Sequence, residues 1–98
     1  MEQLTREQAI AFHDSGAWRE MTDRQRAAFQ VEQDCLCMPF GTFHASVEAV
    51  LGRPVWTHEF GTSNRERLSR EIAGVCGAPT LREILALLPK DKLLLVLA

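Results

Sequence analysis

The stretch from Pro39 to Gly52, PFGTFHASVEAVLG, has the most regular hydrophobic pattern in this 98-residue chain. Pro39 suits the first turn of a helix, because its missing amide costs nothing there, and Gly52 is a common helix terminator. Apolar side chains recur between them at spacings of three and four, which places them on one helical face. This face consists of Phe40, Phe43, His44, Val47, Val50 and Leu51.

Four other segments open with a Ser or Thr that precedes a Glu or Gln by three residues. This spacing is typical of a capping box, in which each side chain bonds the backbone amide of the other residue. We therefore expect further helices over about 6–15, 23–36, 64–75 and 81–88. The capping pairs are Thr5 with Gln8, Thr22 with Gln25, Ser63 with Glu66, and Thr80 with Glu83.

Two segments favour extended structure instead. Pro54 disfavours helical geometry at the residue before it, and the residues that follow, Val55 to Thr57, favour strand. The run Leu93–Leu97 is short and has no polar face, which is typical of a buried strand. A strand needs a partner for its backbone groups, so we predict that about 54–57 pairs with 93–97. The expected fold class is α+β, mostly α: about five short helices and a two-stranded ribbon in a single compact domain over 1–98.

The composition favours a folded globular protein over a nucleic-acid-binding or membrane protein. Hydrophobic residues make up 46% of the chain, as in folded globular proteins, and the formal net charge is −2. A near-neutral charge argues against direct nucleic-acid binding, which needs a basic face. The chain has no apolar run near the roughly 18 residues that cross a membrane, and its polar N-terminus does not resemble a signal peptide. We therefore expect no membrane association, a cytoplasmic location in a host cell, and reduced thiols at Cys35, Cys37 and Cys76.

The sequence predicts no metal, no cofactor and no enzymatic activity. A structural zinc site usually shows two closely spaced ligand pairs, whereas this chain has one Cys-x-Cys and scattered ligands. It also has neither a nucleophile elbow nor a glycine-rich phosphate loop. The residues considered as ligands or nucleophiles are Cys35, Cys37, His44, His58 and Cys76.

Roles in packing explain these side chains more simply than roles as metal ligands or nucleophiles. We interpret Cys35 and Cys76 as small buried hydrophobes and Cys37 as half exposed. His44 is expected at the edge of the core with a bond to a backbone carbonyl, and His13 is interpreted in the same way.

A local group of arginines and one tryptophan are the candidate partner-binding residues. Both residue types are enriched at the energetic centres of protein interfaces. The alternative is a solvated helix face, balanced by acids such as Glu66, which stands four residues before Arg70. Trp56 is expected in the core, whereas Trp18 could lie in the core or at an interface. The candidates are Arg53, Arg65, Arg67, Arg70 and Trp18.

The order of these segments resembles a group of small phage and prophage accessory proteins that share an LGRPVxTHEF-like core. The resemblance runs from about Leu4 to Leu97 and is most specific at Leu51–Phe60. It implies a phage or mobile-element origin and supplies no catalytic residue. The segments that carry it are AWREMTDRQRAAFQ (17–30), MPFGTFHASVEAVLGRPVWTHEF (38–60) and APTLREILALLPKDK (78–92).

Small phage accessory proteins often bind and block a host protein, and anti-CRISPR proteins are an example. By that analogy we expect a non-enzymatic inhibitor that binds a host defence protein, with a CRISPR–Cas effector as the candidate. It would block nucleic-acid binding or cleavage by that effector. Two alternatives stay open: a small nucleic-acid-binding regulator that uses the arginines, and an accessory protein of virion assembly.

Overall fold

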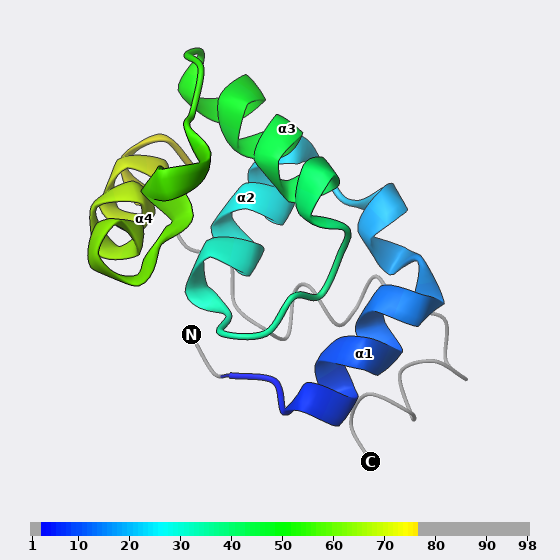
Figure 1. Ribbon diagram of the computed structural model, residues 1–98. Helices are drawn as coiled ribbons and strands as arrows, with labels where there is room; N and C mark the ends of the chain where they lie inside the picture. The colour runs from blue at the N-terminus through cyan, green and yellow to red at the C-terminus, as the bar shows by residue number, and fades with distance from the viewer. Residues whose placement is uncertain (1–2, 77–98) are drawn as a thin grey trace.

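The computed structural model describes residues 3–76, which form a set of short helices around a central one. Helix α2 contacts both α3 and α4, while α1 lies at the opposite side of the molecule from α4 (Figure 1). No helix in this part of the chain is long and apolar enough to cross a membrane. In chain order the elements are α1 (Arg6–Ser15), the 3-10 helix η1 (Ala17–Glu20), α2 (Asp23–Glu32), α3 (Phe40–Leu51), the 3-10 helix η2 (Thr57–Phe60) and α4 (Thr62–Cys76).

Local capping sets the ends of α1, α2 and α3. The predicted capping boxes at Thr5 and Thr22 are confirmed, each with reciprocal bonds to the glutamine three residues later. Gly16 ends α1 and Gly52 ends α3, both with positive φ, at 72° and 67°. Glycine reaches this left-handed conformation without steric strain, so the predicted stop at Gly52 is confirmed and Gly16 acts in the same way.

Helix α2 ends at Glu32, earlier than the predicted position near residue 36. The buried side chain of Gln30 explains the difference. Its Nε2 donates to the Cys35 carbonyl at 2.9 Å, and its Oε1 accepts from the Cys37 amide at 2.7 Å. Because one side chain satisfies both groups, the backbone can leave the helix without orphaned polar atoms.

Helix α4 begins at Thr62, so the predicted start at Asn64 with Ser63 as its cap is wrong. The carbonyl of Gly61 accepts from the amides of Asn64 and Arg65, at 2.9 and 2.8 Å. The helical bonding pattern therefore starts from the Gly61 carbonyl.

The core lies between α2 and its neighbours. Phe12 of α1 and Phe29 of α2 are fully buried, with ring centroids 5.4 Å apart. Val47 of α3 and Leu68 and Ile72 of α4 bury their side chains against the other faces of the same cluster. A hydrogen bond connects the segment before α1 to the end of α2, because the Leu4 amide donates to the side chain of Gln33 at 2.9 Å.

The predicted two-stranded ribbon and the α+β fold class are wrong, because residues 3–76 contain helices and no strand. Side chains of α3 replace a strand partner for Val55. The Val55 amide donates to the Glu48 carboxylate at 2.9 Å, and its carbonyl accepts from His44 Nε2 at 2.5 Å. The expected bond between His44 and a backbone carbonyl is thereby confirmed. The predicted helix over 81–88 and strand over 93–97 lie outside the described residues.

Candidate functional site

Arg53 joins the segment after α3 to both η2 and α4. Its guanidinium forms paired contacts with the Glu59 carboxylate, at 2.9 and 3.2 Å, and with the Glu71 carboxylate, at 2.8 and 3.0 Å. One further donor reaches the Pro54 carbonyl at 3.0 Å. All five N–H groups of the side chain are thus used within the chain. We call Arg53, Glu59 and Glu71 the Arg53 clamp.

The clamp shifts the acid–base properties of its members. Hydrogen bonds from Arg53 and from the Trp56 amide lower the pKa of Glu59 from its ordinary 4.5 to about 2. Arg53 also lowers the pKa of Glu71, and the two carboxylates raise the pKa of Arg53. A carboxylate whose pKa is lowered by folding stabilises the folded state above its unfolded pKa, and this contribution is lost as the pH falls.

Acid should therefore erase the stability difference between the wild type and Arg53→Gln. At pH 7 the variant should melt at a lower temperature, because Glu59 and Glu71 would face each other without a cation. Between pH 4.5 and about 2 the wild type loses the same contribution, so the two melting temperatures should converge. Thermal unfolding followed by circular dichroism across this range checks the result.

Arg70→Gln is the matched control, because its single contact with Glu66, at 3.3 Å, is exposed to solvent. Exposed pairs of this kind contribute little to stability. A difference between Arg53→Gln and wild type that stays constant from pH 7 to pH 2 would contradict the stabilising role of the clamp.

The four candidate arginines do not form one basic patch. Arg65 bonds Asp34 of the α2–α3 loop at 2.8 Å, and Arg70 makes the expected pair with Glu66. Arg53 belongs to the clamp. Among residues 3–76, only Arg67 of the four has neither an ion pair nor a hydrogen bond from its side chain. Arg53 and Arg65 therefore connect separate segments of the fold, Arg70 pairs within α4, and Arg67 is open to a partner.

The two tryptophans lie in different environments, and the prediction for Trp56 is wrong. Trp56, predicted in the core, is 69% exposed. Trp18 is partly buried: its indole N–H donates to the His13 carbonyl at 3.0 Å, and the Arg19 guanidinium lies 4.9 Å from its ring centre. His13 itself sits beside the Trp18 ring and 3.7 Å from the Asp14 carboxylate. Trp18 is thus committed to intramolecular contacts, and Trp56 is the more available anchor.

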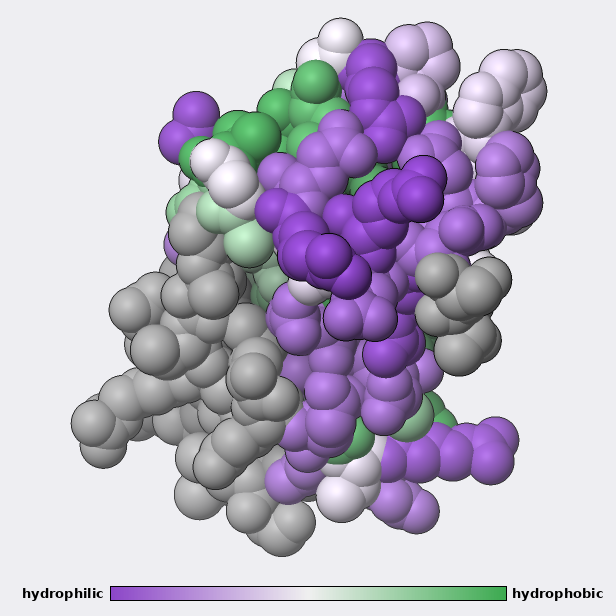
Figure 2. All heavy atoms as spheres, turned by 90° about the vertical axis from the view of Figure 1, so that its left-hand side faces the viewer, coloured by the Kyte–Doolittle hydropathy of each residue, from purple (hydrophilic) through white to green (hydrophobic). Residues whose placement is uncertain are grey.

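Trp56 borders a hollow of about 190 Å³ between η2 and α4. Leu68 lies at its base, and the carboxylates of the Arg53 clamp form part of its wall. The α4 side of the molecule is covered mostly by hydrophilic residues (Figure 2). We call the lining residues Trp56, His58, Asn64 and Arg67, which lie in this hollow beside the Arg53 clamp, the Trp56 surface.

The exposure of Trp56 follows from the extended chain around it. Val55 is buried against α3, and in an extended segment the next side chain points the opposite way. The Trp56 amide donates to Glu59 at 2.9 Å, so the residue is held by the same carboxylate that binds Arg53. The alternation of Val55 and Trp56, with polar residues after them, is the sequence signal that could have indicated the outward position.

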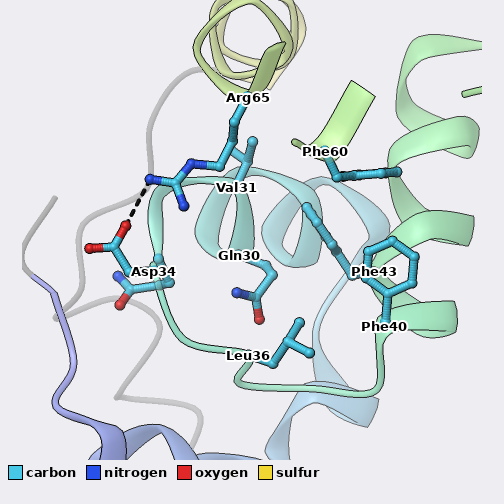
Figure 3. Close-up of a pocket in the computed structure, with 9 residues that line it drawn as sticks. Gln30, Val31, Asp34, Leu36, Phe40, Phe43, Phe60 and Arg65 are labelled. Carbon is cyan, nitrogen blue, oxygen red and sulfur yellow. Dashed lines mark hydrogen bonds and ion pairs between the residues drawn. The ribbon is translucent and has the colours of Figure 1, made fainter. Parts of the chain in front are cut away.

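A second hollow, of about 230 Å³, lies between the α2–α3 loop, α3 and η2. The rings of Phe40, Phe43 and Phe60 line one side of it, and the ion pair of Asp34 with Arg65 lies on the opposite side (Figure 3). We call it the phenylalanine pocket. Gln30 points into it, but both ends of its amide are already bonded to the loop. The pocket is smaller than typical small-molecule sites of about 300–1,000 Å³, and it fits a single side chain better than a cofactor.

The cysteines are placed in the reverse of the predicted order. Cys37 is fully buried, and burial raises the pKa of its thiol to about 12, whereas Cys35 and Cys76 are partly exposed. Cys37 lies in the loop that Gln30 holds through the Cys37 amide, and its side chain is buried there. Within residues 3–76, no group of three or more His, Cys, Asp or Glu side chains comes close enough to hold a metal ion.

Residues 23–78 match the model of a domain of unknown function, DUF7736. The chain belongs to the DUF7736 family. The matched region begins at α2 and includes the Arg53 clamp, the Trp56 surface and the phenylalanine pocket, whereas α1 and η1 precede it. No curated protein and no solved structure matches the chain. The family match therefore groups both hollows in one domain and assigns no activity to it.

Proposed function

We propose that the protein is a non-enzymatic binding module that attaches to another protein through the Trp56 surface. The observation that carries the proposal is the exposure of Trp56, at 69%, on a backbone that is tied at several points. Tryptophan and arginine are the residue types most often found at the energetic centres of interfaces. Trp56 stands beside Arg67, whose donors have no partner within residues 3–76.

The rigidity of the segment supports a binding role. The backbone of Val55 is bonded to two side chains of α3, and the amide of Trp56 is bonded to Glu59 of the Arg53 clamp. An exposed aromatic residue that is already fixed loses little conformational entropy when a partner covers it. The same aromatic side chain on a mobile loop would contribute less to the affinity, because binding would also have to order the loop.

The partner that we propose is a host defence protein, with a CRISPR–Cas effector as the candidate. This part rests on the resemblance to phage accessory proteins. Binding would occupy a functional surface of the effector and so block its binding or cleavage of nucleic acid, without a chemical step by the inhibitor.

The test uses purified protein and candidate effector complexes from the host. The protein should co-elute with one of them in size-exclusion chromatography and reduce its cleavage of labelled DNA. Failure to form a stable complex with any host protein would overturn the proposed function. Retarded migration of DNA by the protein alone would favour the nucleic-acid-binding alternative, and detection of the protein in purified phage particles would favour virion assembly.

Trp56→Ala should weaken the complex by about 30-fold or more, which corresponds to about 2 kcal/mol for an interface anchor. Its thermal stability should stay close to wild type, because the side chain is largely exposed. Isothermal titration calorimetry with the captured partner measures the affinity. Ile10→Ala, which changes a half-exposed apolar residue on α1, is the control and should bind normally. Unchanged affinity of Trp56→Ala would refute the role of this surface.

A further inference from the structure

We propose that the Trp56 surface recognises an acidic side chain that has an apolar neighbour in the partner protein. The partner's carboxylate pairs with Arg67, and the apolar side chain packs on the Trp56 ring and into the adjoining hollow. This inference rests on the proposed function and names the chemistry of the partner at the same surface.

Arg67 is the available cation at this surface. It lies on the same hollow as Trp56 and has no ion pair or hydrogen bond with another residue in 3–76. The clamp uses all donors of Arg53, and Arg70 is paired with Glu66. A guanidinium with open donors offers a planar fork that matches a carboxylate in two contacts.

The Arg53 clamp keeps the nearby carboxylates of this chain from pairing with Arg67, which would otherwise occupy its donors. Glu71 is one helical turn beyond Arg67 and could pair with it, but both of its oxygens accept from Arg53. Glu59 is bound in the same way. With Arg53 between them, these carboxylates neither bind Arg67 nor repel an incoming acid as strongly as free carboxylates would.

The hollow limits what can enter beside the carboxylate. Its volume of about 190 Å³ suits one side chain rather than a ligand of drug size. The buried Leu68 provides an apolar base, and the Trp56 ring an apolar side. An apolar side chain next to the acid in the partner would therefore lose contact with water on both faces.

The charge of the surface favours a protein acid over a nucleic-acid backbone. Arg53 and Arg67 together are balanced by Glu59 and Glu71, and the whole chain has a formal charge of −2. Nucleic-acid binding gains its affinity by neutralising several phosphates at once, which a single open cation cannot do. One carboxylate needs only one such cation.

The probes are the dipeptides acetyl-Phe-Glu-amide and acetyl-Phe-Gln-amide, titrated into the ¹⁵N-labelled full chain. NMR signals of the Trp56 indole N–H and the Arg67 Nε–H should shift with both probes. The Glu probe should bind about fivefold more tightly than the Gln probe, as expected for an exposed charge pair. Arg67→Gln should remove this preference, and Arg67→Lys, which keeps the charge but not the fork, should retain part of it.

Equal or absent binding of the two dipeptides would overturn the inference, and so would tighter binding of a thymidine decanucleotide at the same signals. The proposed function has its own readout. Suppose that a host protein is bound by the wild type and lost with Trp56→Ala. If Arg67→Gln still binds it with unchanged affinity, the proposed function holds but recognition of a carboxylate by Arg67 is refuted. If Arg67→Gln weakens that capture as Trp56→Ala does, the inference is supported in the complete complex.

Discussion

Phe29→Ala should lower the free energy of unfolding by about 3–5 kcal/mol, the usual range for removing a fully buried phenylalanine. Phe29 has no exposed surface, lies in the central helix α2 and contacts the ring of Phe12 in α1. The variant would lose the transfer energy of the ring and leave a cavity between the two helices. Domains of this size have a total stability of about 5–15 kcal/mol, so the loss could leave the chain partly unfolded at 37 °C.

Urea denaturation followed by circular dichroism measures this change, with Phe40→Ala as the control. Phe40 is only partly buried and borders the phenylalanine pocket, so its loss should cost clearly less. Phe12→Ala should resemble Phe29→Ala if α1 belongs to the same cooperative unit. Two separate unfolding transitions in the wild type would show instead that α1 unfolds independently of the family domain.

Gln30→Met should destabilise the protein by about 2–4 kcal/mol, although the side chain keeps almost the same volume. Methionine cannot bond the Cys35 carbonyl or the Cys37 amide, and each buried polar group left without a partner costs about 1–3 kcal/mol. The loss should be local at first, because these bonds hold the α2–α3 loop rather than the helix core.

The thiol of Cys37 provides a direct readout of this loop. In the wild type Cys37 is fully buried with a raised pKa, so a thiol reagent should modify it far more slowly than the partly exposed Cys35 and Cys76. In Gln30→Met the Cys37 reaction should accelerate at urea concentrations that leave the circular-dichroism signal native. Equal protection of Cys37 in both proteins would show that Gln30 does not hold the loop closed.

The parts of the fold that are encoded locally could be predicted from the sequence. Thr5 and Thr22 cap their helices through residues three positions away, and Gly16 and Gly52 end helices through their own backbone freedom. The regular period of apolar residues in α3 predicts its inner face, where Phe43 and Val47 are buried. Each of these features depends on neighbours within one or two turns.

The features that were missed depend on side chains distant in the sequence. The extended segment predicted over 54–57 ends one residue early, because Thr57 begins η2, and the conclusion that it needs a strand partner is wrong, since His44 and Glu48 bond Val55 from another helix. The partner of Arg53 in α4 lies 18 residues away. No local pattern reveals such contacts.

The contrasting environments of the two tryptophans let one spectroscopic signal separate binding from unfolding. Trp56 is open to solvent, so its emission should lie at long wavelength and be quenched by iodide. Trp18 is partly shielded by Arg19 and by its bond to the His13 carbonyl. An occupied Trp56 surface would lose iodide quenching while Trp18 stays unchanged, and unfolding would expose both. The chain thus carries two built-in optical reporters, one at its proposed interface and one in the contacts between α1 and η1.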